Sequence, residues 1–262
     1  MTKSLPAVLI TGASTGIGAV YAERFARRGH DLVLVARDEA RLNALAGRLR
    51  QENGVAVDVL KADLTASEEL ARVEARLRED AKIGILVNNA GAASRGSFAD
   101  QDADALDKLI RLNVTAVTRL AGAVTPRFLA AGAGSIINIA SVVALAPEIS
   151  LGIYAATKAF VLTLSQTLQV EFGSRGLYVQ AVLPAATRTE IWERSGRDVN
   201  ALEGVMDVGE LVDAALVGFD RREAITIPPL PDAGQWEAFD AARRAMLPNF
   251  RQEHAAERYR AA

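Results

Sequence analysis

The sequence predicts a single doubly wound α/β domain with a seven-stranded parallel sheet and helices on both faces. Two observations indicate this fold class. Short apolar runs of strand length recur along the chain, and stretches with the apolar spacing of amphipathic helices separate them. Strands that are covered on both faces are apolar throughout, as these runs are. A fold of this kind binds its ligands at the carboxyl ends of the strands.

Seven runs of four to six residues, rich in Val, Ile and Leu, form the predicted strands. They cover residues 7–10, 32–35, 55–60, 83–87, 135–139, 178–183 and 224–227. Between them, apolar residues recur at helical spacing, as in Leu42, Leu45, Ala46 and Leu49 after the second run and Leu70, Val73 and Leu77 after the third. Because strand and helix alternate, we expect right-handed βαβ units.

The predicted domain covers residues 1–228. Pro228, Pro229 and Pro231 end the last strand, and residues 229–262 form a charged helical extension of the same domain, interrupted by Pro248. Residues 186–206 mix apolar and polar side chains, which is typical of a lid that covers an apolar pocket, although the same side chains could simply pack the lid on the body.

Composition excludes several classes of function. The net charge of −2 argues against nucleic acid or an anionic membrane as a partner, and the absence of cysteine excludes disulfides, thiolate metal sites and thiol nucleophiles. The isolated His30 and His254 make a metal site or a histidine base unexpected. The first residues, Met1–Pro6, lack a leader pattern, and no stretch approaches the roughly 20 apolar residues of a membrane span, so we expect a cytoplasmic protein.

A glycine-rich loop follows the first predicted strand. Residues 11–18 read TGASTGIG, and a helical stretch from Ala19 to Arg28 comes next. Glycines at this place let the backbone approach a pyrophosphate, whose charge is stabilised by the N-terminus of the helix. The spacing G-x-x-x-G-x-G differs from the usual G-x-G-x-x-G, so an ordinary βα turn is the alternative.

The end of the second predicted strand indicates which dinucleotide binds. Ala36 occupies the position where an acid would meet a free ribose 2′-hydroxyl, and Arg37 follows it. Because arginine pairs well with a 2′-phosphate, the sequence favours NADP(H) over NAD(H). Asp38 is the counter-evidence, unless it caps the helix that begins near Glu39.

Tyr154 and Lys158 lie four residues apart on one predicted helix, so their side chains share a face. A nearby fixed cation favours the phenolate and would lower the pKa of a tyrosine, which makes it a usable acid and base. Ser141 follows the fifth predicted strand, at the edge of the sheet where ligands bind.

Together with Asp63-Leu64, the NNAG at 88–91, Asn113 and Pro184, these motifs resemble the short-chain dehydrogenase/reductase family over roughly residues 5–228. The resemblance implies a Rossmann-like fold and an NADP(H)-dependent oxidoreductase that interconverts a carbonyl and a secondary alcohol. It also implies a homodimer or homotetramer, in which Ala121, Gly122 and Ala123 would allow close helix approach unless they pack internally.

The resemblance implies a role for each matching residue. Tyr154 would be the general acid and base, Ser141 would hold the substrate oxygen, Lys158 would hold the nicotinamide ribose, and Asn113 would anchor a water relay. Thr189 would meet the carboxamide. The cofactor-binding set implied in this way is Gly12, Ser14, Thr15, Gly16, Ile17, Gly18, Arg37, Asp63, Leu64, Asn89, Ala90, Gly91, Tyr154, Lys158, Pro184, Thr187 and Thr189.

One departure concerns the loop after the sixth predicted strand. The family commonly has Pro-Gly there, and this chain has Pro184-Ala185, so we expect an altered path of that loop. Apolar residues are expected to line the substrate pocket, which suits an apolar ketone or alcohol. They are Val142, Val143, Ala144, Leu145 and Ile153, with Glu148 among them, and Ile191, Trp192, Leu202, Val205 and Met206 in the lid.

Two alternatives remain from sequence alone. An NAD-dependent alcohol dehydrogenase would use the same Tyr154 chemistry, with Arg37 as the feature against it. A dinucleotide-binding scaffold or sensor would keep the fold without turnover, because fold alone does not determine function. The complete set of Asn113, Ser141, Tyr154 and Lys158 argues against a scaffold.

Overall fold

The computed structural model describes residues 5–93, 98–149, 152–194 and 198–260. The described chain forms two compact units, Met1–Pro228 and Pro229–Ala262, and each is described by itself. Residues 195–197 of the expected lid lie outside the described residues. The assignment of the C-terminal unit to the same domain stays a prediction.

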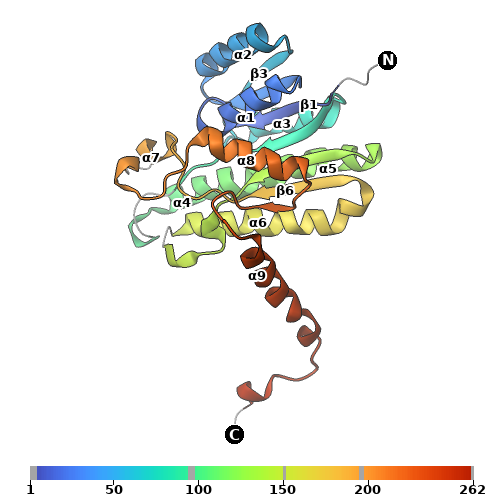
Figure 1. Cartoon of the computed structure of the whole chain (residues 1–262), viewed down its shortest axis with the longest axis vertical. Helices are drawn as coiled ribbons and strands as arrows, with labels where there is room; N and C mark the ends of the chain where they lie inside the picture. Colours follow the sequence, from blue (N-terminus) through green and yellow to red (C-terminus); the bar gives the residue numbers. More distant parts are fainter. Residues whose placement is uncertain (1–4, 94–97, 150–151, 195–197, 261–262) are drawn as a thin grey trace. The chain divides into compact units, whose positions relative to one another are not determined.

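A seven-stranded sheet forms the centre of the first unit (Figure 1). All its pairings are parallel, in the order β3-β2-β1-β4-β5-β6-β7, which confirms the predicted fold class. The strands are β1 (Ala7–Thr11), β2 (Leu32–Ala36), β3 (Val57–Lys61), β4 (Ile83–Asn88), β5 (Gly134–Ile139), β6 (Leu177–Val182) and β7 (Ile225–Thr226).

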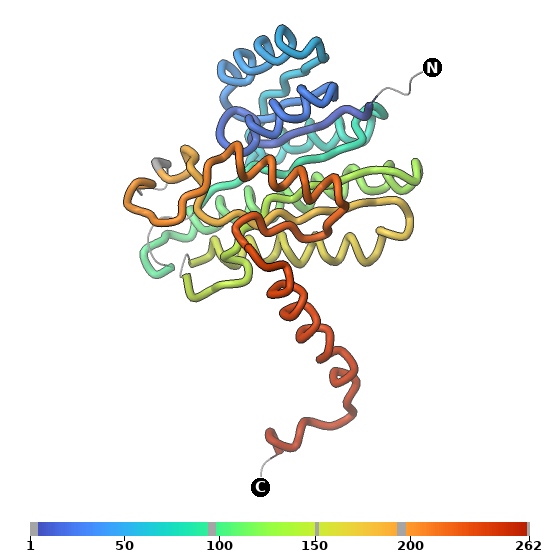
Figure 2. Tube along the Cα trace, viewed as in Figure 1, coloured from blue at the N-terminus to red at the C-terminus, as the bar shows by residue number. Residues whose placement is uncertain are grey.

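The order reverses between β1 and β4, because the chain from β1 winds first through β2 and β3 and then returns to the other side of β1 (Figure 2). At such a switch point the loops that leave two neighbouring strands diverge and open a crevice. The loops after β1 and β4 are those that carry the glycine-rich motif and the NNAG motif.

Helices alternate with the strands as expected. Those of the first unit are α1 (Gly16–Arg27), α2 (Glu39–Asn53), α3 (Ser67–Glu79), α4 (Ala103–Ile110), α5 (Val117–Ala131), α6 (Ile153–Phe172), α7 (Ile191–Arg194) and α8 (Val208–Asp220).

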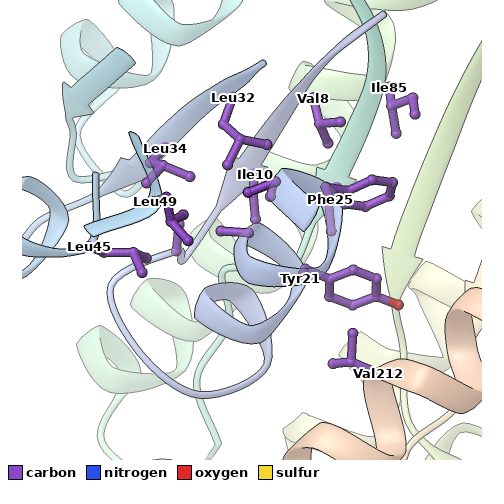
Figure 3. Close-up of a cluster of buried hydrophobic side chains, with 14 of the residues drawn as sticks. Val8, Ile10, Tyr21, Phe25, Leu32, Leu34, Leu45, Leu49, Ile85 and Val212 are labelled. Atoms are coloured by element: carbon purple, nitrogen blue, oxygen red, sulfur yellow. The ribbon is translucent and has the colours of Figure 1, made fainter. Parts of the chain in front are cut away.

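Side chains of the central strand β1 alternate between two apolar cores. Val8 and Ile10 of β1 face a core that contains residues of α1, α2 and α8, whereas Ala7 and Leu9 face a core that contains residues of α3 and α5. In the first core, Tyr21 and Phe25 of α1 are almost fully buried beside the strands (Figure 3). Burial on both faces explains why β1 and β2 have no polar side in the sequence.

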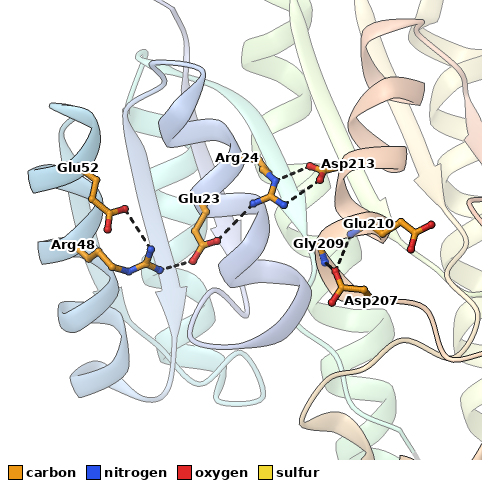
Figure 4. Close-up of polar contacts among 8 residues, drawn as sticks. All are labelled: Glu23, Arg24, Arg48, Glu52, Asp207, Gly209, Glu210 and Asp213. Atoms are coloured by element: carbon orange, nitrogen blue, oxygen red, sulfur yellow. Dashed lines mark hydrogen bonds and ion pairs between the residues drawn. The ribbon is translucent and has the colours of Figure 1, made fainter.

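Ion pairs tie α1 to the helices beside it (Figure 4). Arg24 donates two hydrogen bonds to Asp213 of α8, at 2.6 and 3.1 Å, and Glu23 pairs with Arg48 of α2. Asp207 caps α8 by accepting from the backbone N–H groups of Gly209 and Glu210. These contacts fix the helix that follows the glycine-rich loop.

One helix begins earlier than predicted, and another contains an irregular turn. The first begins at Gly16, three residues earlier than Ala19, with Thr15 at its N-cap, so the glycine-rich loop itself forms the first turn. Asn113 lies in a π-helical turn, residues Arg111–Ala116, that joins α4 to α5. Such turns are rare inside helices and are frequent at functional sites.

The second unit contains α9 (Ala233–Ala245), which Asp232 caps through the N–H of Gly234. Asp240 accepts hydrogen bonds from Arg243 and forms an ion pair with Arg244. Pro248 lies in a 3₁₀ turn, Leu247–Phe250, directly after the helix.

The helices in the described part of the chain are all too short or too polar to cross a membrane.

The start of β5 offers a test of the packing. A Cβ at Gly134 would lie 2.1 Å from the ring of Phe128, which is itself buried, so we expect Gly134→Ala to lower the free energy of unfolding by about 1–3 kcal/mol. Gly47→Ala is the matched control. Its Cβ would meet nothing within 4 Å in the interior of α2, and we expect a gain of about 0.5–1 kcal/mol. Urea unfolding measures both, and equal effects would contradict this packing.

Candidate active site

A cavity of about 1250 Å³ opens where the carboxyl ends of the strands meet. It is lined from the loops after β1, β2, β3, β4, β5 and β6, and by α4, α6 and residues 184–192. A smaller recess of about 410 Å³ between α3 and α5, lined by residues such as Glu74 and Arg127, contains none of the predicted site residues. The larger cavity is therefore the candidate active site.

The glycine-rich loop packs against the loop after β4 with no room for side chains. A Cβ at Gly12 would lie 2.7 Å from the amide nitrogen of Asn89, and φ of Gly12 is +67°, where residues with a Cβ are strained. A Cβ at Gly18 would lie 2.4 Å from both that nitrogen and the carbonyl oxygen of Gly12. Gly18 thus serves the packing behind the loop and does not line the cavity, unlike Gly12 and Gly16.

Hydrogen bonds join the same two loops. The Thr11 hydroxyl donates to the carbonyl of Val87 at 3.2 Å and accepts from the N–H groups of Asn89 and Ala90, both at 3.0 Å. The Asn89 amide donates to the carbonyl oxygens of Thr11 and Gly12, at 2.9 and 3.2 Å. The ends of β1 and β4 are thereby fixed, and the N-terminus of α1 faces the cavity between them.

The end of β2 agrees with the sequence interpretation. β2 ends at Ala36, and the Asp38 carboxylate caps α2 by accepting from the N–H of Arg41 at 3.0 Å. Arg37 lines the cavity with 64% of its side chain exposed, and its nearest carboxylate is Asp63 at 4.0 Å. Asp38 is engaged in the helix cap, and Arg37 is open to an anion.

Asp63 lines the same end of the cavity as Arg37. Its carboxylate accepts from the N–H and the hydroxyl of Thr65, at 2.9 and 2.8 Å. Burial acts to raise the pKa of Asp63, but these bonds and the charges of Arg37 and Lys108 outweigh it and hold the pKa below its usual value.

Ser141, Tyr154 and Lys158 meet at the other end of the cavity. Ser141 leaves β5, and its hydroxyl donates to the carbonyl of Pro184 at 3.2 Å. Tyr154 and Lys158 come from the first turns of α6, with the ammonium nitrogen 5.6 Å from the centre of the phenol ring. The Lys158 ammonium donates to the carbonyl of Ile139 at 2.8 Å. All three residues line the cavity, as predicted.

The ionisation of this pair differs from the sequence-based expectation. Burial raises the pKa of Tyr154 to about 12, and a hydrogen bond with Ser141 only partly opposes that rise. Burial also lowers the pKa of Lys158 to about 8. Lys158 does not lower the pKa of Tyr154 below its ordinary value in this structure, because withdrawal from water disfavours the phenolate.

Asn113 stands behind the site and does not line the cavity. Its side chain donates to the carbonyl of Ala92 at 2.9 Å and to the Thr157 hydroxyl at 3.1 Å, and it accepts from the N–H of Ala92 at 3.0 Å. Asn113 thus joins the loop after β4 to the first turn of the helix that carries Tyr154. The π-helical turn brings its side chain to this position.

Residues 184–190 form the remaining edge of the site. Thr187 and Thr189 line the cavity, and the Thr189 methyl lies 3.2 Å from where a Cβ of Gly16 would be. Among the described residues, Arg222 is the one non-glycine residue with a positive φ, so the φ of Ala185 is negative. The backbone conformation at position 185 is therefore one that alanine adopts without strain.

The structure brings most predicted cofactor residues to one cavity. Ser14, Thr15, Gly16, Ile17, Leu64, Ala90, Gly91 and Pro184 line it with those already described. Of the predicted substrate wall, Val142, Val143, Ile191, Trp192 and Leu202 line the cavity, whereas Ala144, Leu145, Glu148, Ile153, Val205 and Met206 do not. Further residues that line the cavity had not been predicted: Ile149, Glu190, Glu203, Ala105, Lys108 and Leu109 of α4, and Leu112 of the turn after it. The helical spacing of Ala105, Leu109 and Leu112 could have indicated that these residues share a face.

Comparison with known proteins places the chain in a family. The sequence model of the short chain dehydrogenase family matches residues 6–200. Among solved structures, a short-chain dehydrogenase from Sphingobium yanoikuyae in complex with NADPH is 66% identical. It superposes with a TM-score of 0.96 over 98% of this chain and 100% of its own. A bulky-bulky ketone specific alcohol dehydrogenase from Comamonas testosteroni is 59% identical, with a TM-score of 0.92 over 98% and 99%.

Curated relatives are more distant. The very-long-chain 3-oxoacyl-CoA reductase of Anas platyrhynchos is 35% identical over 70% of this chain, and the chain matches only 60% of the length of that reductase. An uncharacterised oxidoreductase of Staphylococcus saprophyticus is 30% identical over 84% of this chain and 93% of its own length.

The buried ammonium of Lys158 has a consequence for stability. Its folded pKa of about 8 lies below the ordinary 10.5, so the charged form destabilises the fold below pH 8, and the penalty fades as pH rises toward 10.5. We expect Lys158→Met to raise the free energy of unfolding by about 1–3 kcal/mol at pH 7 and by much less at pH 10. Urea unfolding at both pH values measures this. The exposed Lys82→Met is the control, and a Lys158→Met variant less stable than wild type at pH 7 would contradict the account.

Proposed function

The chain belongs to the short-chain dehydrogenase family, and from this premise we propose that it is an NADP(H)-dependent oxidoreductase that interconverts a ketone and a secondary alcohol. The observation that carries the proposal is the joint placement of Ser141, Tyr154 and Lys158 at one end of a cavity and of Arg37 at the other. A dinucleotide is long enough to bridge a phosphate site and a reaction site, and this cavity supplies both.

The residues present fit NADPH. Glycines at 12 and 16 leave a cradle beside the N-terminus of α1, which suits the pyrophosphate. Arg37 suits the 2′-phosphate as a bidentate partner, and Asp38 is already engaged as a helix cap. The Sphingobium dehydrogenase and the Gluconobacter frateurii L-sorbose reductase, which is 28% identical, are both complexed with NADPH. These observations favour NADP(H) over NAD(H).

The bound cofactor would supply or accept the hydride. In carbonyl reduction, Tyr154 donates its proton to the carbonyl oxygen, and its raised pKa keeps the phenol protonated across the neutral range. Ser141 donates a hydrogen bond to the same oxygen and stabilises the charge that develops there. In alcohol oxidation, the same phenol must first lose its proton.

Lys158 and Asn113 support the tyrosine. The Lys158 ammonium lies beside the phenol ring, and when it is protonated its charge favours the phenolate that forms as the proton leaves. Asn113 holds Thr157, whose hydroxyl donates to the carbonyl of Tyr154 at 2.8 Å. Asn113 would therefore position the catalytic turn of α6, in addition to any relay through water.

An apolar ketone or alcohol is the proposed substrate class. Val142, Val143, Ile149, Ile191, Trp192 and Leu202 line the cavity, and the specificity for bulky-bulky ketones of the Comamonas enzyme is consistent with such a wall. A homodimer or homotetramer stays part of the proposal. Ala121 and Ala123 are buried within the subunit, so of the three small residues only Gly122 offers an exposed position.

Arg37 provides the test of cofactor preference. We expect Arg37→Gln to weaken NADPH binding about 10- to 100-fold, because a charge-assisted pair with the 2′-phosphate is lost, and to leave NADH binding nearly unchanged. Nicotinamide fluorescence titration measures both affinities. The control is Arg72→Gln on α3, which lies outside the cavity. Equal weakening of NADPH and NADH would contradict the role of Arg37.

Tyr154 provides the test of catalysis. We expect Tyr154→Phe to reduce kcat by at least about 100-fold in both directions, since the proton donor is removed, and to change NADPH affinity less than threefold. Steady-state kinetics on a bulky ketone and fluorescence titration measure the two quantities. Tyr259→Phe, at an exposed position in the second unit, should match wild type. Undiminished turnover in Tyr154→Phe would overturn the mechanism.

A further inference from the structure

An ion pair between distant parts of the first unit lies at the edge of the cavity. One guanidinium nitrogen of Arg41, in the first turn of α2, donates to both carboxylate oxygens of Glu190 at 2.8 Å. The two residues are 149 positions apart in the sequence. Glu190 lines the cavity together with Arg37 and Asp38. The pair therefore joins the end of the loop after β6 to the helix that begins beside Arg37.

Arg41 is held by a second carboxylate. Its Nε lies 3.4 Å from Asp38, whose other oxygen accepts from the backbone N–H of Arg41. The guanidinium thus lies between Asp38 and Glu190. Arg37, in contrast, is 4.0 Å from its nearest carboxylate and is the more exposed of the two side chains, at 64% against 50%. This difference assigns phosphate binding to Arg37 and a different task to Arg41.

The segment that Glu190 ends has a fixed course. At its start, the carbonyl of Pro184 accepts from the Ser141 hydroxyl, and near its end Thr189 packs on Gly16. Backbone hydrogen bonds join Ala186 and Arg188 to Met206, at 2.9 and 3.0 Å. The indole N–H of Trp192 donates to the carbonyl of Thr187 at 2.7 Å. Residues 184–190 thus run from the catalytic serine, over the phosphate loop, to α2.

We propose that Arg41 and Glu190 are positioning residues that hold segment 184–190 against the bound cofactor and thereby slow its release. The inference rests on the proposed function, because it requires NADP(H) in the cavity. A dinucleotide that reaches from Arg37 to Tyr154 must run alongside this segment, past Thr189 and Thr187. Breaking this ion pair removes the contact of the segment with α2 while leaving its start at Ser141 and the contacts of Arg37 intact.

The test is the rate of NADPH release, followed by nicotinamide fluorescence in stopped flow with the full-length protein. We expect Glu190→Gln to release NADPH about two- to five-fold faster and to raise the KM for NADPH by a similar factor, without a decrease in kcat. Arg41→Gln, which removes the other partner of the same ion pair, should speed release by a similar factor. High salt should speed release in wild type more than in Glu190→Gln.

Asp220→Asn is the matched control. Asp220 accepts two hydrogen bonds from Arg28, at 2.8 and 3.0 Å, with an exposure similar to that of the tested pair, but this pair joins α1 to α8 away from the cavity. Release from Asp220→Asn should equal that from wild type.

Three results would count against the inference. If Glu190→Gln releases NADPH at the wild-type rate, and wild type binds NADPH, the positioning role of the Arg41–Glu190 pair is rejected and the proposed function stays intact. If Arg41→Gln loses its preference for NADPH over NADH and Glu190→Gln keeps it, Arg41 is a phosphate ligand. That result also rejects the positioning role of the pair. Failure of wild type to bind NADPH rejects the proposed function itself, before any variant is compared.

Discussion

The close approach of the loops after β1 and β4 is the constraint on which the site depends. The Thr11 hydroxyl accepts from the backbone N–H of Asn89, and the Asn89 amide donates to the carbonyl of Thr11. The loops lie so close that a Cβ at position 12 or 18 would clash. Because the strand order reverses between β1 and β4, these loops border the crevice of the sheet. The same contacts therefore close the fold at its switch point and shape the cradle for an anionic ligand at the N-terminus of α1.

The end of the cavity that holds Ser141, Tyr154 and Lys158 depends on a second set of buried polar contacts. The Asn88 amide donates to Asn138, which donates to Ser165 of α6, both at 2.9 Å. This chain fixes β4, β5 and α6 relative to one another, and these three elements lead to Asn89, Ser141 and Tyr154. Lys158 is buried beside them at a cost in solvation, which is a common property of sites that need a perturbed pKa. In the proposed mechanism, stability and reactivity are thus opposed at this position.

Much of the fold could be predicted because its elements are local and strongly patterned. All seven strands were predicted to within two residues at each end, since each is an apolar run covered on both faces. The role of Asp38 as a helix cap and the end of β2 at Ala36 also followed from local sequence. The predicted catalytic and cofactor-binding residues were brought to one cavity, apart from Gly18 and Asn113, which support it from behind.

What could not be predicted depends on distant contacts. The ion pair between Arg41 and Glu190 joins helix α2 to the loop after β6, and no spacing in the sequence relates the two. The rise in the pKa of Tyr154 depends on how much water the folded chain excludes, and a pattern of residues four apart does not report that. The π-helical turn at Asn113 could not be predicted either, because the apolar spacing of the sequence does not distinguish it from the regular helical turns on both sides.

The most direct test of the account is the fate of the hydride. With NADPH carrying deuterium at the reactive hydrogen of the nicotinamide, reduction of a bulky aryl ketone is predicted to place one deuterium on the carbinol carbon of the alcohol product, as read by mass spectrometry and NMR. Product without deuterium at that carbon, or no alcohol at all from any ketone in a panel while NADPH is bound, would contradict the assignment of this cavity to hydride transfer.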